Sequence, residues 1–342
     1  MLYPVGEYVH QNLSTTFTDV HQLLNELKET RFTGYMSVHY WGFEALIIVD
    51  AGQIIQAFIK TDKEIISGLE ALEIIYEKIL EKDGDINVVR IDNELTLMLS
   101  ALPYAEEKNQ KFLLNNDTLV KIQNLLEEKG FSAIIATREN QSGIDISLFF
   151  YEGQLLTIAG KQNNELFLMG LNDLGKLIKF IKTTPIESSI YYINIHKSVE
   201  VLEDFALQAT FNRWKEYYEK LFHILFKSFE VQHVDVLNLK KIFQENRLQL
   251  ADQYGFLDPF LEILEIKDGE LQVNEFINIY DFINGMDELI YKSLQSIKES
   301  KIKKIDGNEI HFLIQKESEN YLDLMEKIPV DRRKFGNELT GV

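Results

Sequence analysis

An internal duplication constrains the fold of this chain more than any other feature of its sequence. Phe32 corresponds to Phe131, an offset of 99 residues (131 − 32), and Gly52 corresponds to Gly153, an offset of 101 (153 − 52). Both glycines stand in short polar turns between apolar runs, where a residue with positive φ is expected. A repeat of roughly one hundred residues predicts two copies of one domain, because solenoid repeats are much shorter.

Both copies predict the same order of elements. An amphipathic helix precedes three strands, which are followed by a long helix, a fourth strand and a closing helix. The long helices are predicted at 61–84 and 164–183. Ile86 and Ile190 align the fourth strands with an offset of 104 (190 − 86). Residues 1–17 are polar and have no clear period, so they predict no element.

Beyond residue 211 the periodicity becomes helical. The pattern predicts a hairpin centred on Asp268–Gly269, because this dipeptide favours a tight turn. It also predicts a strand at 309–313.

The predicted fold class is α+β, with two tandem duplicated α-β-β-β-α-β-α domains followed by a mainly helical C-terminal domain. The predicted parts are a first domain at 1–102, a linker at 103–116, a second domain at 117–211, a helical domain with a small hairpin at 212–300, and a charged segment at 301–342.

Charge and composition narrow the classes of partner. The formal net charge is −19, which argues against nucleic acid and against an anionic membrane surface. The sequence shows no signal peptide and no apolar run near the ~20 residues of a membrane-spanning helix. We therefore expect a cytoplasmic protein that does not insert into membranes.

The residues that usually carry catalysis or metal binding form no motif in this sequence. There is no cysteine, and the seven histidines show no metal-ligand spacing. The chain also lacks a phosphate-binding loop and a G-x-S-x-G nucleophile elbow. The sequence therefore predicts a protein that is not an enzyme and that carries no cofactor or metal.

An apolar loop at 254–261 is the most unusual candidate for an interaction site. Phe256, Leu257 and Phe260 could form a docking knob, held rigid by Asp258–Pro259. The alternative is that this loop packs the helical domain onto the duplicated one.

An aromatic stripe in the first predicted helix after residue 211 is the second candidate. Trp214 and Tyr218 belong to this stripe. They could contact a partner or lie beside a bound ligand.

Each copy also resembles the PATAN domain of bacterial signalling proteins. The residues that carry the resemblance are Phe32–Thr33–Gly34, the Gly52 turn and Ala57, with Phe131–Ser132–Ala133 and Gly153 in the second copy. The resemblance implies an interaction or regulatory module. It also implies partners such as a small GTPase or a regulator of pili or motility.

Together these features predict a non-catalytic signalling or scaffold protein that acts through protein–protein interaction. A homodimer is a further hypothesis. The alternative function is a small-molecule sensor for a nucleotide, with the ligand held between the repeats or beside the helical domain.

Overall fold

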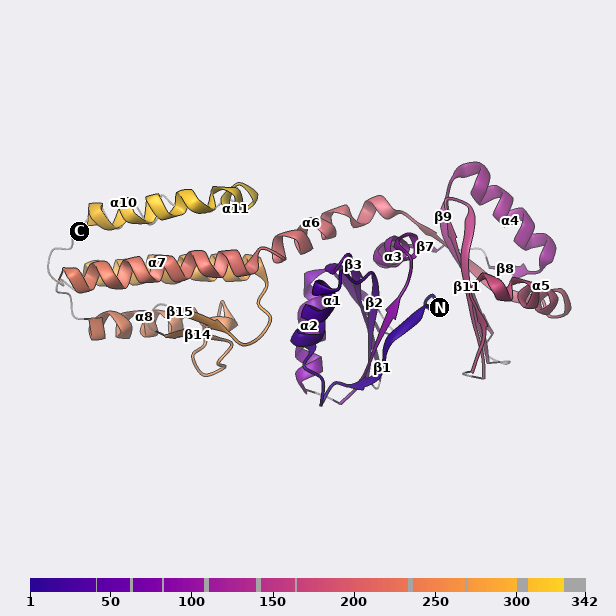
Figure 1. Ribbon diagram of the computed structural model, residues 1–342, viewed down its shortest axis with the longest axis horizontal. Coiled ribbons are helices and arrows are strands. Elements are labelled where there is room, and N and C mark those ends of the chain that lie inside the picture. Colours follow the sequence, from indigo (N-terminus) through magenta and orange to yellow (C-terminus); the bar gives the residue numbers. More distant parts are fainter. Residues whose placement is uncertain are drawn as a thin grey trace. The chain divides into compact units, whose positions relative to one another are not determined.

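A computed structural model describes residues 1–40, 42–61, 64–81, 83–107, 111–139, 143–163, 165–232, 236–267, 270–299 and 307–328. The chain divides into two compact units, residues 1–205 and residues 206–342. Figure 1 shows the elements of each unit. The predicted α+β class with a helical C-terminal region is confirmed.

The first copy of the repeat forms an antiparallel sheet in the order β1-β6-β2-β3-β4-β5. Its strands are β1 (Glu7–Ser14), β2 (Gly34–Tyr40), β3 (Phe43–Asp50), β4 (Gln53–Lys60), β5 (Ile65–Ser67) and β6 (Asp85–Arg90). Helices α1 (Val20–Glu29) and α2 (Leu69–Glu81) cover the outer face (Figure 1). Helix α3 (Asn93–Ser100) contacts β3 on the other face.

The second copy forms a sheet in the order β12-β11-β10-β9-β13-β7, and β8 also pairs with β13. Its strands are β7 (Glu106–Glu107), β8 (Phe112–Leu114), β9 (Ser132–Glu139), β10 (Ile144–Tyr151), β11 (Gln154–Gln162), β12 (Glu165–Met169) and β13 (Ile186–Ile193). Helices α4 (Asn116–Lys129) and α5 (Leu174–Thr183) lie on its outer face (Figure 1). Helix α6 (Val199–Gln208) follows β13.

Backbone details repeat between the two sheets. The register between β3 and β4 shifts between Ile48 and Val49, and the register between β10 and β11 shifts between Phe149 and Phe150. These positions are equivalent at an offset of 101 (149 − 48). A β-bulge at the same place in both copies supports the duplication inferred from the sequence.

Gly52 and Gly153 close equivalent hairpins, as the sequence predicted. Their φ angles are +82° and +84°, in the region that favours glycine. The N–H of Gly52 donates to the carbonyl of Phe32 at 2.7 Å, and that of Gly153 to the carbonyl of Phe131 at 2.9 Å.

The predicted alignment of the fourth strands is wrong by two residues. Met36 pairs with Val88, and its counterpart Ile135 pairs with Ile190. The offset at this strand is therefore 102 (190 − 88). A slip of two residues keeps every side chain on the same face of a strand, so the apolar pattern alone could not fix this register.

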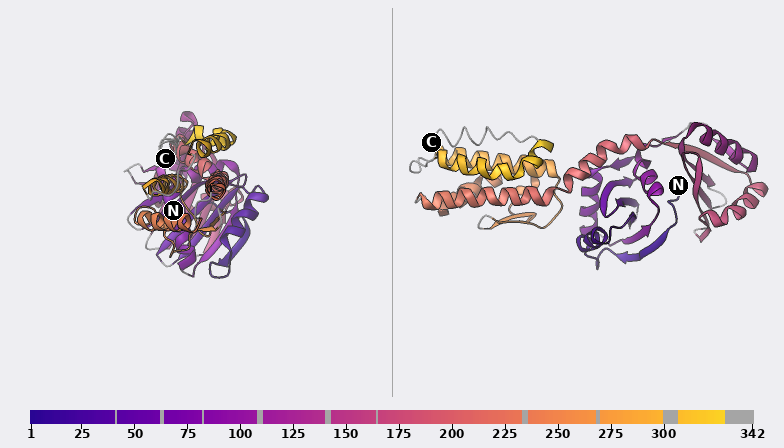
Figure 2. Two further views of the ribbon diagram at one scale, coloured as in Figure 1. Left: turned by 90° about the vertical axis from the view of Figure 1, so that its left-hand side faces the viewer. Right: turned by 45° about the horizontal axis from the view of Figure 1, so that its top comes forward.

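The inner faces of the two sheets pack against each other in the unit formed by residues 1–205. Their shared core joins Leu46 and Phe58 of the first sheet to Ile134 and Phe149 of the second. Helices α1, α2, α4 and α5 lie outside this pair of sheets (Figure 2), whereas α3 contacts both β3 and β10. The layers of this unit therefore run helix, sheet, sheet, helix, with α3 between the sheets.

The long helices predicted at 61–84 and 164–183 are wrong at their beginnings. Strands β5 and β12 occupy the described residues there, and helices begin only at Leu69 and Leu174. Gly68 (φ +83°) and Gly170 (φ +81°) separate strand from helix in both copies. A short apolar run fits a strand and a buried helix equally well, and this ambiguity caused the error.

Strand β1 lies in the segment from which the sequence predicted no element. Its exposure changes every two residues because its pairing with β6 contains two register shifts. Such a strand does not alternate between buried and exposed side chains as a regular strand does.

The stretch 103–116, expected as a linker, contributes β7 and β8 to the second sheet in its described part.

Helices dominate the second unit. They are α7 (Phe211–Val231), α8 (Val236–Leu250), α9 (Ile279–Glu299), α10 (Gly307–Ser318) and α11 (Leu322–Lys327). Strands β14 (Leu264–Lys267) and β15 (Glu270–Val273) pair as the predicted hairpin, whose turn residues lie outside the described residues.

The strand predicted at 309–313 is wrong, because these residues belong to α10. Ile310 and Ile314 are both buried, four residues apart as on one face of a helix.

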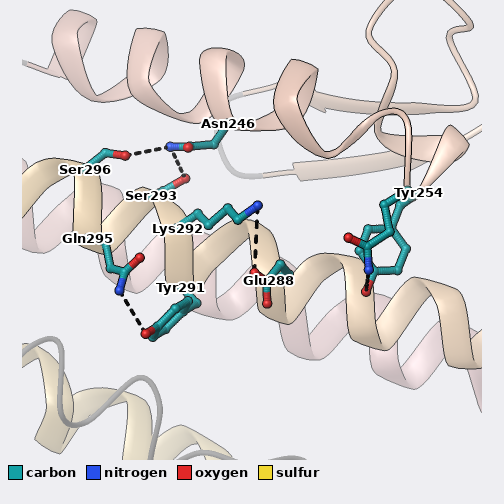
Figure 3. A network of polar contacts seen from close by, with 9 residues as sticks. Asn246, Tyr254, Glu288, Tyr291, Lys292, Ser293, Gln295 and Ser296 are labelled. Carbon is teal, nitrogen blue, oxygen red and sulfur yellow. Dashed lines mark hydrogen bonds and ion pairs between the residues drawn. The ribbon is translucent and has the colours of Figure 1, made fainter.

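A polar network links α8 to α9 (Figure 3). The side-chain amide of Asn246 donates to the hydroxyls of Ser293 and Ser296, at 3.3 Å each. Asn246 and Ser293 are buried. The network satisfies polar atoms that would otherwise be buried without partners.

Candidate functional site

The structure buries four of the five side chains proposed from the sequence as interaction residues. Trp214, Tyr218 and Leu257 are fully buried, and Phe256 is 6% exposed. All four belong to the core of the helical unit. These four side chains therefore fill the core and offer no surface to a partner.

Phe260 is the exception, because 82% of its side chain is exposed. The Asp258 carboxylate accepts a hydrogen bond from the Phe260 N–H at 2.8 Å, so the turn is held rigid. Of the three side chains predicted to form a docking knob, only Phe260 is exposed.

A different site lies between the sheets of the duplicated unit. It is a cavity of about 390 Å³, which we call the Tyr191 cavity. Strands β4 and β5 supply Phe58, Lys60 and Ile65 to its wall, and β13 supplies Ser189 and Tyr191.

A second cavity, of about 400 Å³, lies between the same two sheets, and we call it the Asn87 cavity. Strands β11 and β12 supply Ala159, Lys161 and Leu166 to its wall, and β6 supplies Asn87 and Val89.

Residues of one cavity are the repeat counterparts of residues in the other. Strand pairing makes Lys60 equivalent to Lys161, because Lys60 pairs with Ile65 and Lys161 pairs with Leu166. The offset of 102 likewise makes Asn87 equivalent to Ser189. The two cavities are therefore related by the pseudo-symmetry of the duplication.

The chain segment before β1 separates the cavities. Met1 and Tyr3 line both of them. The Leu2 N–H donates to the buried hydroxyl of Ser147 in the second sheet at 2.9 Å, and the Tyr35 hydroxyl in the first sheet donates to the Pro4 carbonyl at 2.9 Å. Hydrogen bonds to both sheets therefore hold this segment between them.

Charged groups of both signs lie around the Tyr191 cavity. The Lys111 ammonium and the Glu187 carboxylate form an ion pair at 2.8 Å. Burial raises the pKa of the Tyr191 phenol, and the Glu107 carboxylate raises it further. Tyr191 is thus a neutral hydrogen-bond donor at physiological pH. Lys60 has no ion-pair partner within the part of the chain that the structure describes.

Two hydroxyl groups among the residues that line this cavity bond to the backbone. The Thr137 hydroxyl donates to the Ile146 carbonyl at 3.1 Å and accepts from the Ile146 N–H at 2.9 Å. The Ser188 hydroxyl donates to the Ile186 carbonyl at 3.0 Å. These hydroxyls therefore orient the wall of the cavity.

Sequence reasoning offered a ligand site between the repeats as an alternative and paired Lys60 with Lys161, but it did not identify the residues that line the cavities. The pairing came from matching hairpins, and it carried no information about which faces of the sheets meet. The sequence signal for a shared inner face was an apolar run on each of the strands that precede the hairpins, at 45–49 and at 148–150.

Among the described residues, no group of three or more histidine, aspartate or glutamate side chains is placed to hold a metal ion. Each helix in the described part of the chain is too short or too polar to cross a membrane.

A family model described as an uncharacterized protein conserved in archaea (DUF2226) matches residues 1–102. This segment is the first copy of the repeat. No curated protein and no solved structure matches the chain.

The archaeal match overturns the resemblance to the bacterial PATAN domain. The structural residues that carried that resemblance, such as Phe32 and the Gly52 turn, are explained by the hairpin geometry described above. The implied partners in pilus, motility or GTPase-linked signalling rested on the resemblance and lose their support with it.

Proposed function

We propose that this is a non-catalytic binding protein whose duplicated unit holds a small polar molecule in the Tyr191 cavity. The observation that carries the proposal is the cavity itself, which combines ammonium, carboxylate and phenol groups with an apolar wall between two sheets. Sites for small molecules combine apolar walls with a few polar groups in the same way.

The size of the cavity narrows the ligand. Its volume of about 390 Å³ lies near the lower end of the roughly 300–1,000 Å³ of small-molecule sites. A molecule of the size of a mononucleotide, a sugar phosphate or an amino acid derivative suits this space better than a cyclic dinucleotide.

The hydrogen bonds of two hydroxyl-bearing residues that line the cavity argue against a nucleophilic role for them. Thr137 and Ser188 use their hydroxyl protons on backbone carbonyls, whereas a nucleophilic hydroxyl needs a neighbouring base to take its proton. The paired Lys111 and Glu187 can position a ligand with both charges.

Thermal unfolding of the full chain with a panel of mononucleotides, sugar phosphates and amino acids tests the proposal. A ligand at one hundred times its Kd stabilises the folded state by about 2.7 kcal/mol, which raises Tm by a few degrees. We expect such a rise for one chemical class in the panel. Unchanged Tm values across the panel would contradict the proposal.

Protein–protein interaction is the second candidate, and exposed aromatic side chains favour it. Phe17 is 90% exposed and Phe260 is 82% exposed, and exposed aromatic side chains serve as anchors at protein interfaces. If this candidate holds, a protein co-purified with the unmodified chain will be lost from Phe17→Ser or Phe260→Ser. Equal recovery from all three chains would count against it.

A further inference from the structure

The helical unit contains a cavity with an aromatic wall. It measures about 220 Å³ and lies between α7, α8 and β14. Phe222 and Phe226 of α7 and Phe243 of α8 line it. The ring centroid of Phe243 lies 5.6 Å from that of Phe222 and 5.5 Å from that of Phe226. Such a cluster can take the edge or face of one further aromatic ring.

Arg247 of α8 lines the same cavity and is only 8% exposed. Its Nε donates to the Leu257 carbonyl at 3.2 Å, and its Nη2 donates to the Leu264 carbonyl at 2.7 Å. Both acceptors are neutral. Among the described residues, no carboxylate forms an ion pair with this guanidinium, and Nη1 donates no hydrogen bond.

Burial of this guanidinium has an electrostatic cost. Burial lowers the pKa of Arg247, while Asp258 and Glu265 at longer range act in the opposite direction. The group stays charged at neutral pH because an arginine side chain is not deprotonated in proteins. An anion placed against Nη1 would offset this cost.

Further cations line the cavity, in a chain whose net charge is −19. Lys240 and Lys267 both contribute to the lining. Lys267 forms an ion pair with Glu265. Gln244 also lines the cavity and is exposed, so a substitution there changes the charge at the opening without disturbing the core.

We propose that this cavity binds a monocyclic aryl carboxylate. The ring lies against Phe226 and Phe243, with the fully buried Phe222 behind them, and the carboxylate accepts hydrogen bonds from Nη1 of Arg247. The volume fits one ring with a short acid arm. This site lies within the helical unit, and the inference does not depend on the cavities between the sheets.

Titration of the full chain with para-fluorophenylacetate, followed by fluorine NMR of the ligand, tests the proposal. We expect saturable binding, and we expect the neutral amide of the same shape, para-fluorophenylacetamide, to bind at least about tenfold more weakly because it lacks the charge that Arg247 would pair with. Absence of binding at millimolar acid, or equal binding of acid and amide, would overturn the proposal.

Two matched variants of α8 locate the site. Gln244→Glu adds a negative charge at the cavity, and we expect it to weaken binding of the acid by about tenfold through like-charge repulsion. Gln249→Glu adds the same charge on the same helix at an exposed position that does not line the cavity, and we expect a change below about twofold because solvent and salt screen it. Equal effects of the two variants would overturn the assignment to this cavity. Both positions are exposed, so both variants should fold.

Discussion

Gly153 shows how a single residue fixes the geometry of the hairpin turn between β10 and β11. A Cβ atom at this position would lie 2.3 Å from the Cα of Glu127 and 2.4 Å from its nitrogen. Because φ is +84°, any other residue would also strain the turn.

We predict that Gly153→Ala lowers the free energy of unfolding by at least about 2 kcal/mol, because it combines backbone strain with a steric overlap. Urea denaturation measures this change. Gly175→Ala is the matched control, since a Cβ there meets no atom within 4 Å and the residue lies in α5. That variant should be neutral or stabilising by up to about 1 kcal/mol. Equal destabilisation by both variants would contradict the role given to the turn.

Buried phenols make stability depend on alkaline pH. Burial raises the pKa of Tyr3 and of Tyr35 far above the ordinary value of 10.0. The folded state therefore keeps both protons at a pH where the unfolded chain releases them. The stability that these groups contribute is fully present below about pH 10 and is lost as pH rises above it.

The variant Tyr35→Phe tests this dependence. We predict that the loss of unfolding free energy between about pH 7 and about pH 11 is smaller for Tyr35→Phe than for the unmodified chain, because one titrating phenol is removed. At neutral pH the variant should lose about 1 kcal/mol, since the hydrogen bond to the Pro4 carbonyl is gone. Urea denaturation at the two pH values gives both numbers. Identical pH dependence in the two proteins would refute this account.

At the scale of elements, the polar network between α8 and α9 gives a separate prediction. Asn246→Ala removes the donor to Ser293, whose side chain is fully buried. We expect a loss of about 1–3 kcal/mol in the free energy of unfolding, because a buried hydroxyl loses its partner. Gln249→Ala on the exposed face of α8 is the control and should change stability by less than about 0.5 kcal/mol. A neutral Asn246→Ala would show that the network does not stabilise the helix pair.

Element assignment from sequence worked where the apolar period was regular and failed where strands were short or bulged. Helix α7 follows clear helical spacing, and the sequence predicted a helix there. Strands β5 and β12 were merged into helices because runs such as Ile65–Ile66 fit either structure. Strand β1 was missed because its bulges break the alternation.

The candidate sites were harder to predict than the fold. Trp214 and Phe256 were chosen because large apolar side chains in unusual patterns suggest a surface, yet both are buried. The residues of the Tyr191 cavity come from distant stretches, such as Lys60, Lys111 and Tyr191. Only the packing of one sheet on the other brings them together, and no local pattern encodes that packing.

At the scale of the whole duplicated unit, the pseudo-symmetry provides a control position for a substitution in the Tyr191 cavity. Ala136 lines the Tyr191 cavity, and its repeat counterpart Ser37, at an offset of 99 (136 − 37), lines the Asn87 cavity. A large side chain at either position fills one cavity and leaves the other open. Each substitution adds volume next to a packed region and should cost about 1–3 kcal/mol of stability, so circular dichroism must first show that both variants fold.

The most direct test of the central claim is the Kd of the strongest ligand from the thermal panel, measured by calorimetry on the unmodified chain, Ala136→Phe and Ser37→Phe. We predict that Ala136→Phe weakens binding by at least about a hundredfold, or about 2.7 kcal/mol, because the new ring occupies the Tyr191 cavity. We predict that Ser37→Phe binds the ligand within about threefold of the unmodified chain. Unchanged affinity in a folded Ala136→Phe variant would contradict the claim that the ligand lies in this cavity.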